Sequence, residues 1–265
     1  MNAPQSARPV SNEPGWGLAL LASLPRSLCR GGPDADIILL DGRGDWTDIG
    51  LALVQGGSRH ILLIDPAAAP PVAIERLARA VDASDTILTI SESLAGNPTI
   101  VGFKKWLGTE FGIVSIVSTD AMAPRALLLA QLRLLRAAGI RDVNFGHFAE
   151  SPAAFLAEAS ATLAGSPIHV RLSAAQSAAG DPHHLVTAYA ATALARLDLR
   201  PGGEARPAKA SLSTAEGLHE LPSIHESAHR HNLRALPEAA SADPAGALLS
   251  LVDDIALAAG GVPVT

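Results

Sequence analysis

Residues 34–66 read DADIILLDGRGDWTDIGLALVQGGSRHILLIDP, in which two short apolar runs flank an amphipathic segment. The spacing predicts a strand at Ile37–Leu40, a helix at Thr47–Val54 and a second strand at His60–Ile64. Strands that are apolar on both faces are typical of a parallel sheet covered by helices on both sides. This stretch therefore predicts a parallel α/β unit.

The alternation continues after this unit. Apolar positions indicate a helix at Pro71–Val81, a strand at Thr86–Ile90 and a helix at Thr99–Leu107. We therefore expect an α/β fold with a partial doubly wound, Rossmann-like parallel sheet over residues 34–110. Residues 1–33 begin with Pro, Ser, Asn and Ala, and we expect a mobile N-terminal tail followed by a short docking helix at Trp16–Cys29.

Residues 111–265 contain more strand-like patterns, and we expect an α+β domain with a mixed sheet and returning C-terminal helices. The run at His183–Leu199 fits either one helix or two strands around a turn. The remaining expected elements are strands at Gly112–Ser118, Arg141–Phe148, Ile168–Ala175 and Ala208–Leu221, and helices at Pro124–Ala138, Pro152–Ala164, Ile224–Leu236 and Ala245–Ala259.

The composition narrows the classes of function. The 265-residue chain has a net charge of -6, which disfavours a nucleic-acid partner because such partners bind basic surfaces. Its single cysteine, Cys29, excludes an internal disulfide and predicts a free thiol in the reducing cytoplasm. The apolar run at residues 15–24 ends at Pro25 and Arg26, short of the roughly 18 residues that a membrane span needs.

The segment from His60 to Pro66 resembles a motif of the Gfo/Idh/MocA (glucose–fructose oxidoreductase/inositol dehydrogenase) family, His-Val-Leu-x-Glu-Lys-Pro. The apolar positions and the proline match, whereas Ile64 stands at the Glu position and Asp65 at the Lys position. Gly96-Asn97-Pro98 and Gly112-Ile113-Val114 resemble two later points of the same family. The chain is identified as a truncated and degenerate member.

The resemblance implies an oxidoreductase whose first strand leads into a glycine-rich turn for a dinucleotide. Gly42 and Gly44 follow a strand and precede a helix, so they are candidate cofactor-binding residues, or else an ordinary turn. A third glycine and an acidic ribose partner are missing. Because only 33 residues precede this block, the first β-α-β portion of the family is expected to be absent. We therefore expect no cofactor, or NAD or NADP if the contacts are unrecognised.

In the resembling enzymes, the Lys of the motif holds and polarises the hydroxyl or carbonyl group that exchanges a hydride. An ionised carboxylate at Asp65 cannot donate that hydrogen bond, so we expect Asp65 to cap a helix or to face solvent. Asp181 and His184 resemble the family's catalytic Asp and His. They are candidates for a proton-shuttling pair, the alternative being that Asp181 caps the start of an element.

His225-Glu226-Ser227-Ala228-His229 matches the pattern H-E-x-x-H. On a helix this pattern places two imidazoles on one face beside a Glu, as zinc hydrolases require. His225 and His229 are therefore candidate metal ligands. The polar flanks, Pro222-Ser223 on one side and Arg230-His231 on the other, favour a solvated helix face instead.

These observations predict a non-catalytic or partner-dependent subunit that forms a homodimer, assembles with an oxidoreductase-like chain, or binds a small polar, sugar-like ligand. Two alternatives stay open. One is an active NAD(P)-dependent oxidoreductase with unrecognised cofactor contacts, and the other is a zinc-dependent hydrolase. No nucleic-acid or membrane partner is expected.

Overall fold

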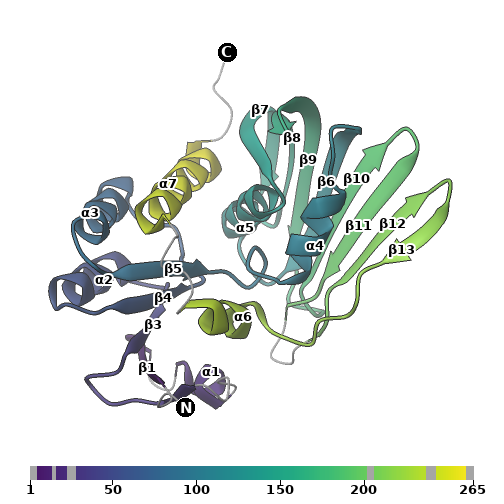
Figure 1. Cartoon of the computed structure of the whole chain (residues 1–265). Helices are drawn as coiled ribbons and strands as arrows, with labels where there is room; N and C mark the ends of the chain where they lie inside the picture. The colour runs from purple at the N-terminus through teal and green to yellow at the C-terminus, as the bar shows by residue number, and fades with distance from the viewer. Residues whose placement is uncertain (1–4, 14–15, 23–27, 202–205, 237–242, 261–265) are drawn as a thin grey trace. The chain divides into compact units, whose positions relative to one another are not determined.

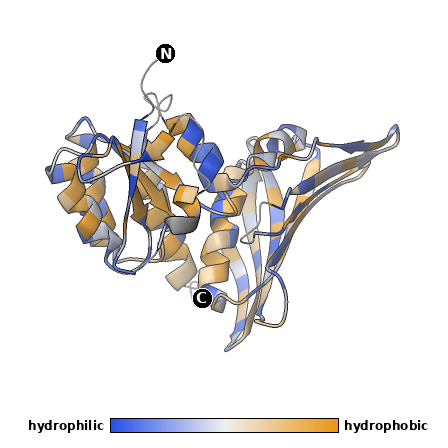
Figure 2. Cartoon of the chain, turned by 90° about the horizontal axis from the view of Figure 1, so that it is seen from below, coloured by the Kyte–Doolittle hydropathy of each residue, from blue (hydrophilic) through white to orange (hydrophobic). Residues whose placement is uncertain are grey.

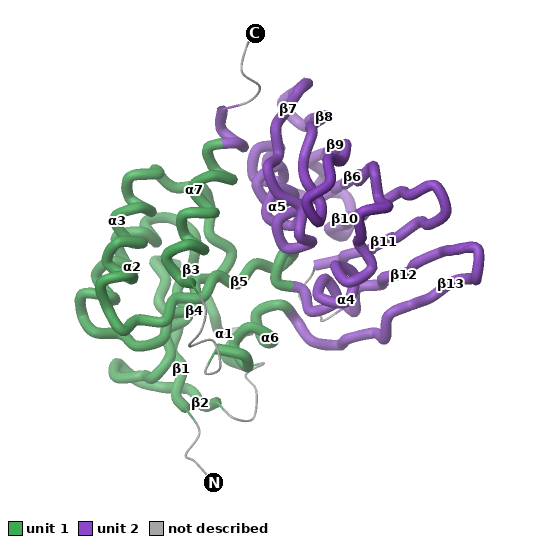
Figure 3. Tube along the Cα trace, turned by 45° about the horizontal axis from the view of Figure 1, so that its top comes forward, with its two compact units in different colours: residues 1–96, 228–256 green, residues 97–227, 257–265 purple. Residues whose placement is uncertain are grey.

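A computed structural model describes residues 5–13, 16–22, 28–201, 206–236 and 243–260 of the chain. The chain divides into two compact units (Figure 3). Unit 1 comprises residues 1–96 and 228–256, and unit 2 comprises residues 97–227 and 257–265. Within the described part, no helix is both long enough and apolar enough to cross a membrane.

Unit 1 contains a five-stranded parallel sheet in the order β2-β1-β3-β4-β5 (Figure 1). The chain order of strand, helix and strand therefore matches the predicted parallel α/β unit. Its strands are β1 Gln5–Val10, β2 Leu28–Arg30, β3 Ile37–Asp41, β4 His60–Ile64 and β5 Ile87–Ser91. Its helices are α1 Leu18–Ala22, α2 Trp46–Gln55, α3 Pro71–Asp82, α6 Ala228–Ala235 and the greater part of α7 Pro244–Gly260.

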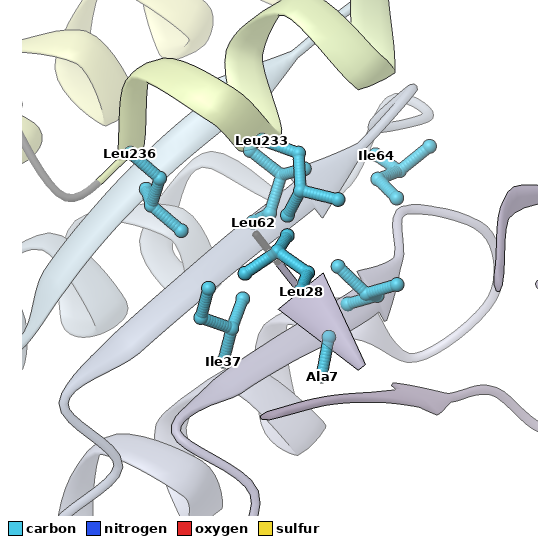
Figure 4. Packing of buried hydrophobic residues seen from close by; sticks show 8 residues of the cluster. Ala7, Leu28, Ile37, Leu62, Ile64, Leu233 and Leu236 are labelled. Carbon is cyan, nitrogen blue, oxygen red and sulfur yellow. The ribbon is translucent and has the colours of Figure 1, made fainter. Parts of the chain in front are cut away.

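Strands β3 and β4 are buried on both faces, which explains why Ile37–Leu40 and Ile61–Ile64 are apolar without alternation. Figure 2 shows the hydropathy of these elements. On one face, Leu39 and Leu62 belong to a core cluster that also includes Leu233 of α6 and the adjacent Leu236 (Figure 4). On the other face, Leu40 lies close to Gly50 of α2. The packing of α6 on this sheet shows that the chain returns to unit 1 after completing unit 2.

The expected mobile tail is wrong, and the expected docking helix at Trp16–Cys29 is shorter than predicted. The tail contains β1, which lies between β2 and β3 in the sheet and buries Ala7 completely. Only α1 is helical within the expected docking helix, and β2 ends it; residues 23–27 lie outside the described residues. A β-α-β portion therefore precedes β3. The strand was obscured because β1 contains Pro9, and a proline argues against a central strand.

Unit 2 contains an eight-stranded mixed sheet in the order β13-β12-β11-β10-β6-β9-β8-β7. The β6–β9 pair is parallel, and the other pairs are antiparallel. Helix α5 contacts β6, β7 and β9, and α4 contacts β11 and β12. The elements are α4 Thr99–Trp106, β6 Phe111–Asp120, α5 Pro124–Ala137, β7 Ile140–Ser151, β8 Ala154–Leu163, β9 Ser166–Gln176, β10 His183–Ala190, β11 Ala193–Leu199, β12 Lys209–Thr214 and β13 Gly217–Glu220.

Two expected elements of this half are corrected, and the open choice at His183–Leu199 is resolved in favour of two strands. The segment predicted as a helix at Pro152–Ala164 is strand β8, in which Phe155 and every second residue after it are buried. The buried positions are mostly alanine, whose high helix propensity hides a period of two. The segment at His183–Leu199 forms two strands, and Ala208–Leu221 forms a hairpin rather than one strand.

The predicted boundaries, 34–110 and 111–265, differ from the two units. Unit 2 begins at Asn97 and so includes α4, while α6 and most of α7 belong to unit 1. The predicted returning helices exist, but they complete the parallel α/β unit rather than the mixed sheet. Sequence order alone does not reveal this return, because a helix can pack on any apolar surface of suitable shape.

Candidate functional site

The carboxyl ends of the parallel strands in unit 1 carry two clusters of polar side chains. In open α/β sheets this edge is where ligands bind, at the point where the strand order reverses. That reversal lies between β1 and β3, because β2 lies on one side of β1 and β3 on the other. The two clusters are called the Asp41 cluster (Ser11, Glu13, Asp41, Arg43) and the Asp65 cluster (Asp65, Ser91, Ser93, His229, Asn232).

The Asp41 cluster bridges the carboxyl ends of β1 and β3. The Asp41 carboxylate is 5% exposed and accepts hydrogen bonds from the hydroxyl of Ser11 at 2.6 Å and from Nε and Nη2 of Arg43 at 3.0 Å each. Arg43 also forms an ion pair with Glu13 at 2.8 Å. Burial raises the pKa of Asp41, but the hydrogen bonds from Arg43 and Ser11 outweigh it and hold the pKa below its usual value.

The described side chains at this edge place negative charge beside the reversal point. A dinucleotide pyrophosphate needs backbone N–H donors at a helix start, whereas Asp41 and Glu13 place two carboxylates beside the reversal point, with Arg43 paired to both. Helix α1 has only five residues. Gly17 has a φ of +78°, and a Cβ there would lie 2.8 Å from Cβ of Pro9, so intramolecular packing already explains this glycine.

The two glycines predicted to cradle a phosphate have different structural reasons. A Cβ on Gly42 would lie 2.4 Å from the carbonyl oxygen of Ile64, so Gly42 allows the close approach of the β3 and β4 ends. Its N–H donates to that same oxygen at 2.8 Å. Gly44 has a φ of +61° with open space around it, which favours glycine on conformational grounds. Their role as cofactor-binding residues stays a prediction.

The Asp65 cluster joins the ends of β4 and β5 to α6. One oxygen of Asp65, Oδ1, accepts the backbone N–H of Ser93 at 2.6 Å. The other, Oδ2, lies 2.7 Å from Oγ of Ser93 and 3.1 Å from Nε2 of His229. Nδ1 of His229 lies 2.9 Å from Oγ of Ser91, which also accepts a hydrogen bond from Asn232 at 3.0 Å.

Asp65 differs from its expected role as a helix cap. Its carboxylate is bound to residues after β5, and α3 has no side-chain cap. The side chain is 48% exposed, so it does face solvent in part. Burial raises the pKa of Asp65, but hydrogen bonds from His229 and Ser93 outweigh it, so the pKa lies below the usual value. The backbone of Asp65 has a φ of +45°, a left-handed conformation that often marks functional sites.

The H-E-x-x-H pattern does not lie on one helix. Helix α6 begins at Ala228, so His225 and Glu226 precede it, and the His225 side chain is exposed. Among the described residues, no group of three or more His, Cys, Asp or Glu side chains is arranged to hold a metal ion. The helical condition for a zinc hydrolase is therefore not met at His225 and His229.

Asp181 and His184 have different partners in unit 2. Asp181 is exposed and forms an ion pair with Arg206. His184 is 1% exposed, with Nδ1 at 2.9 Å from Oγ of Ser118 and Nε2 at 3.4 Å from a carboxylate oxygen of Asp120. Burial lowers the pKa of His184 despite the opposing charge of Asp120. The structure therefore gives His184 a carboxylate partner other than the one predicted.

Sequence reasoning did not select Asp41, Ser91, Ser93 or Asn232. Asp41, Ser91 and Ser93 could have been selected by their position in the sequence. Each lies at or just after the last residue of a parallel strand, and the carboxyl ends of such strands are where ligands bind. Asn232 carries a signal only with His229, because the two are three residues apart and share one face of a helix.

Two comparisons, with protein-family models and with curated proteins, find no match for this chain. Comparison with solved structures finds similar folds. A dehydrogenase (MviM) from Clostridium difficile matches with a TM-score of 0.70 and 11% identity, over 95% of this chain and 98% of that one. A proposed NADPH-dependent oxidoreductase from Desulfitobacterium hafniense matches with a TM-score of 0.75 and 10% identity, over 97% and 95%.

The chain has the two-domain fold of the Gfo/Idh/MocA-type oxidoreductases. A further structure with this fold is the 3-ketoreductase KijD10 from Actinomadura kijaniata in complex with TDP-benzene and NADP, with a TM-score of 0.64 and 12% identity, over 86% of this chain and 79% of that one. In this Gfo/Idh/MocA-type fold, unit 1 is the parallel α/β domain and unit 2 the mixed-sheet domain. The predicted fold class is confirmed.

Proposed function

We propose that this chain is a non-catalytic or partner-dependent subunit with an oxidoreductase fold, which binds a small polar ligand and does not bind a nicotinamide dinucleotide by itself. The observation that carries the proposal is the Asp41 cluster. A buried, ionised carboxylate stands beside the strand-order reversal and is bridged to β1 through Ser11 and Arg43. A pyrophosphate placed there would meet like charge from Asp41 and Glu13.

The residue at position 65 supports the same proposal. A carboxylate stands where the resembling enzymes have a lysine, and its Oδ1 is already occupied by the N–H of Ser93. The exposed part of Asp65 accepts hydrogen bonds, and the neighbouring hydroxyl of Ser93 both donates and accepts them. Such a pair suits the hydroxyl groups of a small polar ligand rather than a hydride acceptor.

The open face of the unit 2 sheet supports a role in assembly. Val114, Ile116 and Ser118 of β6 point toward the face that α5 covers, so the alternate residues point the other way. Large apolar side chains on that other face are 37–49% exposed and include Ile113, Val117, Tyr189 and Leu194. We therefore propose a homodimer, or a hetero-oligomer with an oxidoreductase-like chain, because large exposed apolar patches commonly mark interfaces.

The proposal also places the protein in the cytoplasm, because Cys29 is exposed and free and has no partner in the sequence for an internal disulfide. Light scattering at micromolar concentration, alone and after co-expression with an oxidoreductase-like chain, tests the assembly. A monomer under both conditions would contradict that part.

One observation favours an active NADP-dependent oxidoreductase as a second candidate. Arg30 is the last residue of β2 and is exposed. In dinucleotide-binding folds, the residue at this strand end contacts the ribose of the cofactor, and an arginine nearby accommodates the 2′-phosphate of NADP. This candidate predicts that NADPH binds more tightly than NADH and that Arg30→Ala removes the difference.

Isothermal titration calorimetry of the full chain with NADH and with NADPH separates the two candidates. We expect no binding tighter than millimolar for either nucleotide. The matched variant Asp41→Asn keeps the shape of the side chain but removes its charge, so it shows whether the carboxylate prevents nucleotide binding. Micromolar binding of NADPH by the unaltered chain, weakened by Arg30→Ala, would overturn the proposal in favour of the second candidate.

A further inference from the structure

Three ligand atoms converge at the exposed end of the Asp65 cluster. Oδ2 of Asp65, Oγ of Ser93 and Nε2 of His229 are separated by 2.7, 3.1 and 3.1 Å. A metal–ligand bond of about 2.1 Å places two neighbouring octahedral ligand atoms about 3.0 Å apart. The three atoms therefore have the spacing of one face of an octahedron.

The surrounding contacts hold these atoms in the orientation that a metal ion requires. The backbone N–H of Ser93 occupies Oδ1 of Asp65, which leaves Oδ2 available. Oγ of Ser91 lies 2.9 Å from Nδ1 of His229 and is fixed in turn by Asn232. Metal binding would replace the Nε2 proton that His229 donates to Asp65, while Nδ1–H would donate to Ser91. Such outer hydrogen bonds are a regular feature of histidine ligands.

The exposure of the cluster suits a site that takes an ion from solution. The side chains of Asp65 and His229 are 48% and 19% exposed, whereas Ser91 is completely buried. The ligand atoms thus lie at the surface, and the groups that orient them lie beneath. The remaining positions around an ion would be filled by water.

We propose that Asp65, Ser93 and His229 form a binding site for one divalent transition-metal ion in octahedral coordination, with water at the other positions. An imidazole nitrogen with a carboxylate suits Zn²⁺, Co²⁺ or Ni²⁺ better than Mg²⁺ or Ca²⁺, which prefer oxygen ligands only. The ion and Asp65 together carry a net charge of about +1. That is the charge of the lysine that the resembling enzymes have at this position, so the bound ion would polarise a ligand hydroxyl there.

The site is independent of the H-E-x-x-H pattern and of the proposed lack of dinucleotide binding. It uses His229 but not His225, which lies in the extended segment before α6. It needs only residues of unit 1 and no dinucleotide, so its failure would leave the Asp41 cluster and the proposed function unaffected.

The test is calorimetric titration of the full chain, without a histidine tag, with Zn²⁺ alone and with Co²⁺ alone. We expect one ion per chain and a Co²⁺ absorption band in the visible region. His229→Gln and Asp65→Asn should each weaken binding at least about tenfold, since even outer-contact losses cost about 10–100-fold in metal affinity. Ser91→Ala should weaken it less than either ligand variant.

His225→Ala is the matched control, because it removes the other histidine of the pattern from an exposed position, and binding should be unchanged. Circular dichroism checks that each variant is folded, and a Zn²⁺-dependent rise in melting temperature in the unaltered chain, lost in His229→Gln, gives a second readout. The proposal is overturned by the absence of saturable uptake, or by uptake that His225→Ala removes and His229→Gln does not.

Discussion

The two units each contain a histidine in contact with a serine hydroxyl and near a carboxylate, but the surroundings differ. In unit 2, His184 is 1% exposed and lies between Ser118 and Asp120. In unit 1, His229 is 19% exposed and reaches Ser91 and Asp65. The same three residue types therefore form an interior polar network in one unit and a surface cluster in the other.

The elements that carry the two histidines explain the difference. His184 is paired directly with Ser118 across adjacent central strands, on the face that α5 covers. Gln131 of α5 donates to Ser118 at 2.7 Å and to the carbonyl oxygen of Ser173 at 2.8 Å, which closes the network off from water. His229 lies on the first turn of α6 at a sheet edge. Similar hydrogen bonds therefore specify packing in unit 2 and leave room for a ligand in unit 1.

The substitution His184→Ala should have the largest effect. It removes a buried ring and leaves the polar groups of Ser118 and Asp120 with one partner fewer, so we expect the free energy of opening of the sheet to fall by about 2–3 kcal/mol. Hydrogen exchange of the β6 and β10 amides, read by mass spectrometry, measures it.

The neighbouring His183→Ala is the control, because His183 is 38% exposed and paired with Asp198 at 3.2 Å. Its effect should stay within about 0.5 kcal/mol. Equal losses of stability for His184→Ala and His183→Ala would show that the buried hydrogen bonds of His184 do not contribute specifically to the stability of unit 2.

A smaller effect is expected from pH. Burial lowers the pKa of His184, against the opposing influence of Asp120 and together with that of His183. The unfolded chain takes up a proton near the usual pKa of about 6.5, while folded unit 2 keeps the ring neutral. Stability should therefore be full above about pH 6.5 and fall as the pH drops toward the lowered pKa.

Hydrogen exchange of the same amides at pH 7.5 and pH 5.5, corrected for the intrinsic exchange rate, tests this dependence. The loss at lower pH should shrink in His184→Gln, which cannot titrate, and persist in His183→Ala. A gain in stability at pH 5.5 would mean that the ring is protonated in the folded state and that the assigned direction is wrong.

The sequence predicted the parts of the fold that depend on strongly apolar strands. Ile37–Asp41 and His60–Ile64 form two central strands as expected, because both faces of that sheet are buried. It did not predict β1 or β8, since Pro9 in one and the alanines in the other weaken the local signal for a strand. In both segments, pairing with the neighbouring strands of the sheet determines the structure.

The candidate site was predictable only in part. His229 was selected because it belongs to the H-E-x-x-H pattern, which the structure does not place on one helix. Asp65 was selected because it stands where the family motif has a lysine. The contact that joins them spans 164 residues of sequence and requires the chain to return from unit 2 to unit 1, and no local pattern carries that information. Gly42 shows the same limit, because the carbonyl of Ile64 that requires a glycine belongs to the next strand.

The smallest stability effect is expected for His229→Gln in unit 1. Asp65 is half exposed, so water can replace the lost contact, and the glutamine amide can still donate to Asp65 or to Ser91. Partly exposed ion pairs contribute about 0–1 kcal/mol, so hydrogen exchange of the β5 and α6 amides in the absence of metal should change by less than about 1 kcal/mol. A loss as large as that of His184→Ala would show that His229 is a structural residue like its counterpart in unit 2. In that case the Asp65 cluster would not bind ions from solution. His229 and His184 would then differ in their place in the fold but not in their role.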